Sequence, residues 1–363
     1  MKVTFPHMGP VRIYQKLFEM LGNEVIPPPA PTQRTIELGV KYSPEFICFP
    51  FKIILGSYLE AIEHGAEVIV TSGGIGACRA VYYGDLSEKI LSQMGHQVKV
   101  IVFDSVFDDI GRFWRDLQTL RNGKSLFEVY QALRLCIQLV YANDRYQKKL
   151  ISLLPHETVP GSCHRQWLAI RELFYQCNRL KDFKSCLEEA ERIIGNISLT
   201  PRNDLIKVGL VGEIYLVMES WANHELEEKL AGLGAEVVRT QYISDWLTHT
   251  LRPPRELLRK TDRFLKYGIG GHEKENIGQI IHFKELGFDG VIHLLPFGCM
   301  PELVTQALIP ALSSSLDLPI LSLSLDEQTG WVNQQIRLEA FIDLLRSRKE
   351  EQKEALSWSG NTI

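Results

Sequence analysis

The sequence predicts an α/β protein with two parallel-sheet domains and a helical insertion between them. Strand-sized apolar runs alternate with helical patterns near both ends of the chain, which is typical of parallel sheets flanked by helices. The run 67–70 has no polar face after its first residue, as expected for a strand buried on both sides. Between about residues 120 and 199 the strand signals vanish and apolar residues recur at helical spacing.

The first domain is expected over residues 1–122. We expect strands at 2–5, 24–26, 67–70 and 99–103, and helices at 11–21 and 51–64. Four prolines, at positions 27, 28, 29 and 31, form a stiff connection that cannot be helical.

The insertion is expected over residues 123–200, with helical patterns at 125–150 and 165–194. The second domain, 201–363, is expected to contain strands at 207–211, 236–240, 290–295 and 320–325, and helices at 224–233 and 337–346. Residues from Lys349 onward are polar, and we expect them to fray. Both sheet domains are therefore predicted to be Rossmann- or flavodoxin-like.

A faint internal repeat links the two sheet domains. The segment 21–26, Leu-Gly-Asn-Glu-Val-Ile, has a counterpart in 233–238, Leu-Gly-Ala-Glu-Val-Val, and 65–69 has one in 287–292. Each segment combines a helix end, a glycine and the start of a strand. The repeat indicates two related domains, but junctions of this kind also look alike in unrelated proteins.

Composition narrows the class of protein. The chain has 363 residues, 45% of them apolar and 23% charged, and its net charge of −4 gives no basic field for nucleic acid. The apolar runs are shorter than a membrane span and the first residues lack a secretion signal, so we expect a cytoplasmic protein without membrane contact. Disulfides are rare there, so the seven cysteines favour metal ligation or simple burial.

Three cysteines share one kind of position. Each is predicted to follow an extended segment, in a loop containing glycine or proline, just before a helix: Cys48, Cys78 and Cys299. Ligands of α/β sheets gather at the carboxyl ends of the strands, so these loops are expected to converge in one crevice. A helix N-terminus stabilises a thiolate, and nearby glycines let backbone N–H groups approach an inorganic cluster. Inert buried cysteines remain the alternative, because the spacing is not a compact motif.

Charged residues beside these cysteines are further candidates. Arg79 and Glu302 could tune a cluster or transfer protons, or they could simply lie at helix N-termini; for Lys52 we favour the latter. The turn 268–276 brings His272 and Glu273 to a helix start, where they could reach the site or form a hinge. His293 is interpreted as a core histidine.

The remaining cysteines lie in the helical region. Cys136 is expected in the core, and a second metal site at Cys163, Cys177 and Cys186 is the less favoured interpretation of the other three.

The surroundings of the three cysteines resemble a known family. Four stretches carry the resemblance: Cys48-Phe49-Pro50-Phe51-Lys52, the loop 73–84 with Cys78-Arg79, 296–302 (Pro-Phe-Gly-Cys-Met-Pro-Glu), and 326–330 leading to 337–341. They are similar to the iron–sulfur subunits of 2-hydroxyacyl-CoA dehydratases and benzoyl-CoA reductases. The similarity is greater to the related CoA protein activases, also called acyl-CoA dehydratase activase-related proteins, and to double-cubane cluster proteins.

The resemblance implies an iron–sulfur cluster on Cys48, Cys78 and Cys299, with [4Fe–4S] favoured and a double-cubane [8Fe–9S] cluster as an alternative. It also implies an ATP-dependent activator of actin-like fold that delivers a low-potential electron, a ligand at an open iron, and a homo- or heterodimer with a related cluster subunit. The sequence contains no P-loop, so we expect no ATPase activity of its own. The alternative function is a non-catalytic cluster carrier, sensor or scaffold, and a third is an α/β binding protein without a cluster.

Overall fold

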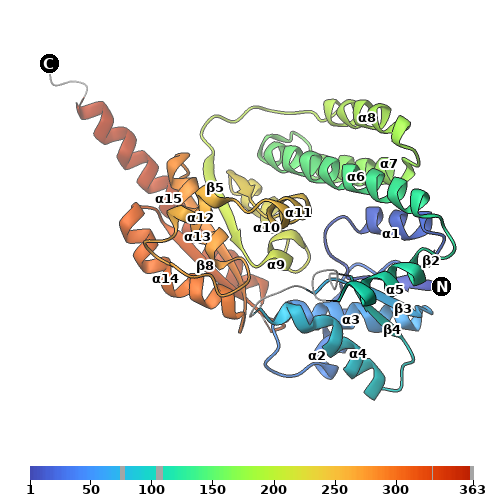
Figure 1. Ribbon diagram of the computed structural model, residues 1–363. Coiled ribbons are helices and arrows are strands. Elements are labelled where there is room, and N and C mark those ends of the chain that lie inside the picture. Colours follow the sequence, from blue (N-terminus) through green and yellow to red (C-terminus); the bar gives the residue numbers. More distant parts are fainter. Residues whose placement is uncertain (74–77, 104–108, 329, 360–363) are drawn as a thin grey trace.

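Two four-stranded, all-parallel sheets lie amid helices, which confirms the predicted α/β class (Figure 1). The computed structural model describes residues 1–73, 78–103, 109–328 and 330–359. The strand order is β2-β1-β3-β4 in the first sheet and β6-β5-β7-β8 in the second. Both orders are the 2-1-3-4 pattern of flavodoxin-like folds.

The first sheet comprises β1 (Lys2–Thr4), β2 (Glu24–Val25), β3 (Val68–Thr71) and β4 (Lys99–Val102). Val68 and Val70 pack on the side of α1 (Val11–Met20), whereas Ile69 packs on the side of α3 (Phe49–Glu63). Because both faces are covered, β3 must be apolar on both, as its sequence predicts. The helices α4 (Tyr83–Gln93) and α5 (Ile110–Leu120) follow β3 and β4 along the chain.

The second sheet comprises β5 (Ile206–Gly212), β6 (Ala235–Arg239), β7 (Gly290–Pro296) and β8 (Ile320–Leu325). The side chains of α13 (Glu273–Glu285) and α14 (Met300–Leu316) cover one face. The short helices α9 (Ile214–Met218) and α10 (Leu226–Gly232) and the long α15 (Trp331–Ser359) pack on the other. The core on this second face is continuous with α3 and α4 of the first unit, so the two sheets share one buried interior.

The chain that connects the two sheet units is mainly helical. Its α-helices are α6 (Leu126–Leu153), α7 (Ser162–Gln176) and α8 (Phe183–Gly195), and they pack with one another and with α1. The pattern expected over 165–194 is thus two helices rather than one, separated by a break that begins at Cys177. Both helices bury residues in the same core, which is why the apolar periodicity continues across the break.

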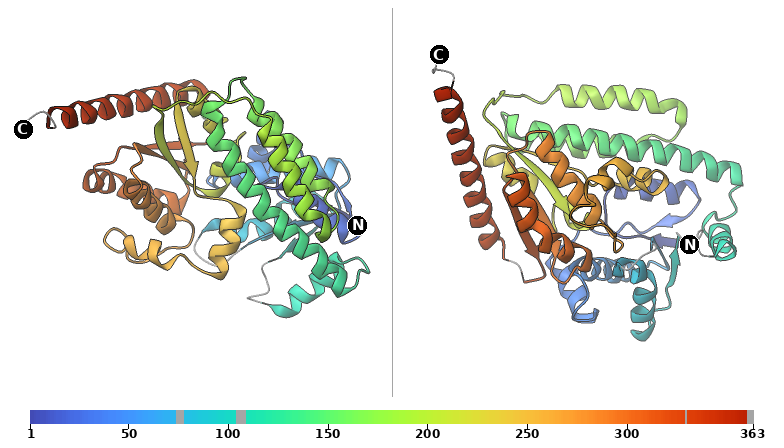
Figure 2. Two further views of the ribbon diagram at one scale, coloured as in Figure 1. Left: turned by 90° about the horizontal axis from the view of Figure 1, so that it is seen from above. Right: turned by 60° about the vertical axis from the view of Figure 1, so that its left-hand side comes forward.

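Two further differences from the prediction concern α2 and α15. The sequence pattern gave no sign of α2 (Gln33–Tyr42), which begins at a capping box formed by Thr32 and Thr35. The prediction that the chain frays from Lys349 onward is wrong, because α15 continues to Ser359. The C-terminal end of this helix projects away from the body (Figure 2). Lys349 and Lys353 bond to Asp289 and Asp204, which holds this part of the helix against the second sheet.

The helices α2 and α3 touch backbone to backbone. A Cβ atom at Gly39 would overlap the carbonyl of Lys52, and one at Gly56 would overlap the carbonyl of Thr35. Only glycine permits an approach this close. The two helices therefore form one rigid pair, and Cys48 lies at the start of its second member.

The suspected repeat corresponds to equivalent points of the two sheets. Gly22 and Gly234 precede the second strand of each unit at φ +84° and +79°, and Gly65 and Gly287 precede the third at φ +94° and +73°. These left-handed conformations are the ones glycine adopts without strain. The pairs share conformation and topological place, but Gly95 before β4 adopts the same conformation at φ +85°, so this conformation is also that of junctions outside the repeat.

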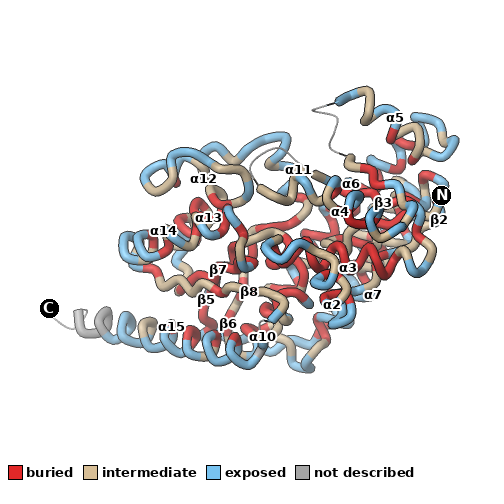
Figure 3. Tube along the Cα trace, turned by 90° about the horizontal axis from the view of Figure 1, so that it is seen from below, coloured by how far each residue is buried: buried red, intermediate tan, exposed pale blue. Residues whose placement is uncertain are grey.

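Buried residues concentrate in the strands and the inner helix faces, and the outer helix faces are exposed (Figure 3). Among the described residues, no helix is both long and apolar enough to cross a lipid bilayer.

Candidate functional site

Cys78 and Cys299 occupy equivalent places in the two units. Each follows the third strand of its sheet, β3 or β7, and each is the residue that caps the next helical segment. For Cys78 that segment is the 3₁₀ turn Arg79–Tyr82 leading into α4, and for Cys299 it is α14. The third strand borders the switch point of a 2-1-3-4 sheet, where ligands of this fold class bind.

Cys48 follows a different kind of element from the other two cysteines. It caps α3, as predicted, but it follows α2 and a turn rather than a strand, so the expected extended segment before it is absent. The Sγ atom of Cys48 lies 2.7 Å from the hydroxyl of Tyr83, which is the first residue of α4. This contact links Cys48 to the helix that follows Cys78.

Arg79 ties all three cysteine loops together. It directly follows Cys78, and its guanidinium donates to the carbonyl of Phe46 at 2.6 Å and to the carbonyl of Gly298. Phe46 lies two residues before Cys48 and Gly298 one residue before Cys299. The two terminal nitrogens of a guanidinium donate in different directions in a fixed geometry, so one side chain can bond two carbonyls that lie apart.

The three thiols influence one another electrostatically. Burial raises the pKa of Cys48 and of Cys78, and the pKa of each is raised further by nearby negative charge, including the Cys78 group in the case of Cys48. Burial also raises the pKa of Cys299, with contributions from Glu213, Glu302 and Cys48. The thiols are therefore protonated in the metal-free protein, because burial outweighs the stabilisation expected from the helix N-termini.

Cysteine thiolates are ligands of thiophilic metals. Thiolates are the ligands of iron–sulfur clusters and bind different irons of the same cluster. A single ion draws all its ligands to within about 2.3 Å of one point. Across the described residues, no three His, Cys, Asp or Glu side chains are grouped as a single ion requires.

Sequence reasoning missed Glu213, a carboxylate beside the cysteines. It follows β5, its backbone N–H donates to the carbonyl of Leu294 on β7, and its side chain accepts from the N–H of Leu216 at 3.0 Å. Burial raises the pKa of Glu213 to about 7, and the nearby Glu302 carboxylate adds to the increase. The only signal in the sequence is a glutamate directly after a buried strand, which is too common to stand out.

Glu302, predicted as a candidate, belongs to a buried polar network. Its carboxylate accepts two 2.9 Å bonds from Asn276 and lies 2.8 Å from Nε2 of His293. Nδ1 of His293 lies 2.9 Å from the hydroxyl of Ser322, and Asn276 also bonds to Gly212 at the end of β5. His293 is completely buried and fully bonded, which confirms the prediction of a satisfied core histidine.

His272 lies near the same carboxylates. Burial lowers the pKa of His272, but the neighbouring Glu275, Glu302 and Glu213 raise it more, and the net direction is upward. Glu273 is buried and accepts a 2.6 Å bond from the N–H of Ile269, so it closes the turn. Gly271, at φ +133°, lies against Pro301 in the first turn of α14, where a Cβ atom would overlap the proline ring.

Lys52 joins the two halves of the chain. It is buried and forms an ion pair with Glu327, which follows β8 in the second sheet unit. We favoured a simple helix-start role for Lys52, and this partner from the other half of the chain is a finding that the sequence did not indicate.

The other four cysteines lie together in the helical core rather than near the candidate site. Cys136, Cys163, Cys177 and Cys186 are buried in one cluster of α1, α6, α7 and α8, as predicted for Cys136. Lys16 of α1 is buried beside them, with its ammonium bonded to Tyr175 and Asn178 at 2.6 Å.

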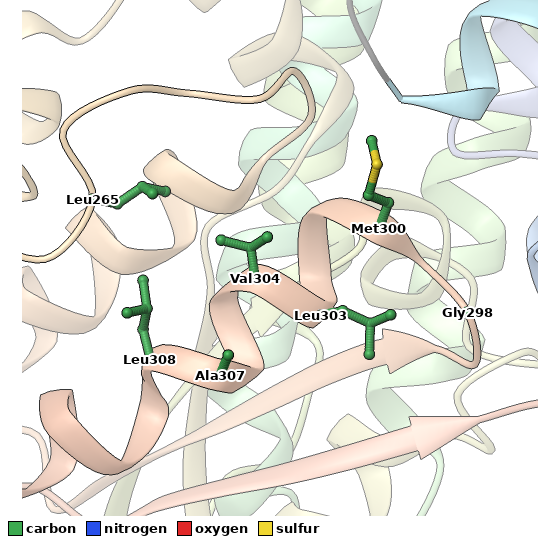
Figure 4. Close-up of a pocket in the computed structure, with 7 residues that line it drawn as sticks. All are labelled: Leu265, Gly298, Met300, Leu303, Val304, Ala307 and Leu308. Carbon is green, nitrogen blue, oxygen red and sulfur yellow. The ribbon is translucent and has the colours of Figure 1, made fainter.

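An apolar groove of about 420 Å³ lies beside the Cys299 loop. Gly298 and Met300 line one end, and side chains of α14 together with Leu265 line the rest (Figure 4). Gly74 and Gly76, predicted to help a cluster approach Cys78, lie outside the described residues, as does Thr329 of the fourth resembling stretch.

The chain was also compared with known proteins. No protein-family model matches it, and no curated protein matches it significantly.

Proposed function

We propose that this chain is a cytoplasmic iron–sulfur redox protein of the 2-hydroxyacyl-CoA dehydratase-like type. Cys48, Cys78 and Cys299 hold one cluster, with [4Fe–4S] favoured over a double-cubane form. A low-potential electron comes from a separate ATP-dependent activator, and a ligand binds at an iron that no cysteine occupies.

One observation carries the proposal: a single guanidinium, that of Arg79, bonds to the loops of both other cysteines and is itself adjacent to Cys78. Phe46 and Gly298 are 33 and 219 residues away from Arg79 along the chain. Bonds of this sort would hold the three cysteine loops close to one another. The four other cysteines pack in the helical core, away from these loops.

The neighbouring side chains have distinct roles in the proposal. The bound cluster would supply one-electron chemistry and an open coordination position. Arg79 orients the loops and places a positive charge next to the thiolates. Glu213, whose pKa of about 7 lets it hold or release a proton near neutrality, lies where a proton could be exchanged with a bound ligand. The buried pair of Glu302 and His293 supports the first turn of α14 and so keeps Cys299 in place.

The test is chemical analysis of protein purified without oxygen. We expect about four irons and four sulfides per chain, a brown colour, and an electron paramagnetic resonance signal after reduction. Replacing Cys48, Cys78 or Cys299 by Ala should abolish most of the bound iron. Cys136→Ala is the matched control, because Cys136 is as buried as Cys48 and Cys299 but lies in the helical core, and it should retain full iron content.

A colourless protein without iron, or equal iron in Cys78→Ala and Cys136→Ala, would reject the proposal. The catalytic alternative is then separated from a carrier or scaffold by turnover. Cluster-loaded protein with its activator and ATP should transform an acyl-CoA, whereas a carrier would only pass its cluster or electron onward.

A further inference from the structure

Two of the four cysteines in the helical core lie against each other where α7 is joined to α8. The two helices pack side by side, with Cys177 capping the end of α7 and Cys186 in the first turn of α8 (Figure 1). The Cys177 thiol donates to the carbonyl of Arg179 at 3.8 Å and is also hydrogen-bonded with the thiol of Cys186. Thiols in such contact can form a disulfide after a small movement of their side chains.

The two thiols have no third ligand beside them. Across the described residues, which include the whole helical core, no three His, Cys, Asp or Glu side chains are grouped as a single metal ion requires. Cys163 instead bonds to Glu157 through both its thiol and its backbone N–H. The metal site that the sequence suggested at Cys163, Cys177 and Cys186 is therefore not assembled for a single ion, and two thiols remain that face each other.

A buried positive charge lies beside the two thiols. Lys16 of α1 is 2% exposed, and its ammonium donates to the carbonyl of Tyr175 and to the side chain of Asn178, both at 2.6 Å. Because these two acceptors lie on either side of Cys177 in the chain, the ammonium is held at the end of α7. Burial and the neighbouring Cys186 raise the pKa of Cys177 to about 12, and Lys16 opposes this increase. The lysine thus makes a thiolate easier to form than burial alone would allow.

The two thiols differ in exposure and in the backbone that carries them. Cys186 is 9% exposed and Cys177 is 2% exposed, so a reagent from solvent reaches Cys186 first. Cys186 belongs to a regular helical turn, whereas Cys177 has left the helix at φ −73° and ψ 97° and begins the connection to α8. This connection can adjust while both helices stay intact, which allows Cys177 to follow once Cys186 has reacted.

We propose that Cys177 and Cys186 form a reversible disulfide by exchange with a low-molecular-weight disulfide such as oxidised glutathione. The Cys186 thiolate attacks one sulfur of the reagent, which forms a mixed disulfide and releases one thiol. The Cys177 thiolate then attacks Sγ of Cys186 and displaces the second thiol. The protons of both cysteines end on the two released thiols, and the reagent has taken up both electrons. The new bond ties the end of α7 to the start of α8.

Peptide mapping of the full-length wild-type chain tests the disulfide directly. Arg179, Lys181 and Lys184 lie between the two cysteines, so trypsin places the cysteines in separate peptides that only a disulfide can join. After incubation with oxidised glutathione, alkylation in denaturant and digestion, segment 172–179 should be linked to segment 185–192. Treatment with a dithiol before alkylation should separate them again.

The other two cysteines of the helical core are matched internal controls. Cys136 and Cys163 are 4% and 1% exposed, so they are about as buried as Cys177 and Cys186, but neither is bonded to another thiol. Both should be recovered as alkylated free thiols in the same digest. Equal alkylation of Cys177 and Cys186 before and after oxidation, or linkage of Cys177 to one of the control cysteines, would overturn the proposal.

Two single variants test the order of attack. In Cys177→Ser the second step is blocked, so a mixed disulfide with glutathione should accumulate at Cys186. In Cys186→Ser the remaining thiol at Cys177 is the less accessible one, and its mixed disulfide should be about tenfold less abundant. Equal amounts in the two variants would reject the order, and the wild-type map tests the disulfide even if a variant does not fold. Iron content measured on the same samples is a separate result, since neither cysteine is a proposed cluster ligand.

Discussion

The two sheet units share their strand order but differ in the contacts made by the residues that follow the cysteine after the third strand. Cys78 and Cys299 both follow the third strand and both cap the next helical segment. Three residues after Cys299, Glu302 enters a buried network with His293 and Asn276. Three residues after Cys78 the chain has Val81, which is only partly buried. The comparison indicates that a buried polar network supports the helix start after Cys299, whereas the residue after Cys78, Arg79, bonds outward to the loops of Cys48 and Cys299.

The largest effect should come from breaking the buried polar network of the second unit. Glu302→Ala leaves His293 and Asn276 buried without their acceptor, and such losses cost about 3–5 kcal/mol. Val81→Ala, at the matching position of the first unit, removes a partly buried side chain and should cost less than about 1 kcal/mol. Urea unfolding of the metal-free protein measures both. Equal costs would mean that the two units support their cysteines in the same way.

The next largest effect should come from breaking the ion pair between Lys52 and Glu327. Lys52→Ala leaves Glu327 without its partner, but Glu327 retains some exposure and can regain water, so we expect a loss of about 2 kcal/mol. Lys89→Ala, at an exposed position of α4, should change the free energy of unfolding by less than about 0.5 kcal/mol. A double-mutant cycle with Glu327→Gln isolates the pair, and a coupling energy near zero would rule out the ion pair in solution.

Removing the guanidinium of Arg79 should lower the free energy of unfolding only moderately. Its main effect should be greater mobility of the loops that it bonds. Arg79→Ala loses two charged hydrogen bonds at a partly exposed position, which should cost about 1–2 kcal/mol. Hydrogen exchange should accelerate around Phe46 and Gly298 and stay unchanged in α7. Arg79→Lys should restore stability only in part, because an ammonium cannot bond both carbonyls in the guanidinium geometry. Full recovery in the lysine variant would contradict this role.

The smallest effects should appear where the units are alike. Gly65→Ala and Gly287→Ala each force an alanine into a left-handed conformation before the third strand, at a cost of about 1 kcal/mol. Neither Cβ atom would clash, so the conformation alone sets the cost and it should be the same in both units. Thermal unfolding checks this, and costs that differ by more than about 1 kcal/mol would argue against equivalent junctions.

The sequence predicted the sheets better than the helices around them. Strands such as β3 and β7 are buried on both faces, so their apolar runs identify them without tertiary information. The helix α2 escaped notice because only Thr35, Ile36 and Gly39 of its residues are buried, which leaves almost no apolar period. The extension of α15 depends on Lys349 and Lys353 finding partners on distant loops, and a local pattern contains no such information.

The sequence predicted where the cysteines lie relative to helices, but it did not predict the hydrogen bonds that link their loops. The position of Cys78 and Cys299 before helices follows from local sequence. The bonds of Arg79 join segments that are up to 219 residues apart, and only the folded chain brings them together. Glu213 was missed for the same reason, since its raised pKa arises from burial and from the nearness of Glu302.

If the proposed cluster is bound, the backbone contact between α2 and α3 would affect the speed of electron transfer. The glycine pair Gly39 and Gly56 leaves these helices no room to slide, so Cys48 is fixed to a stiff support. A redox centre whose ligands do not shift when its charge changes has a small reorganisation energy, because the surrounding dipoles are already in place. For a cluster bound at Cys48, the glycine pair would therefore lower the barrier to gaining and losing an electron, although both glycines lie in helices and neither touches the cluster.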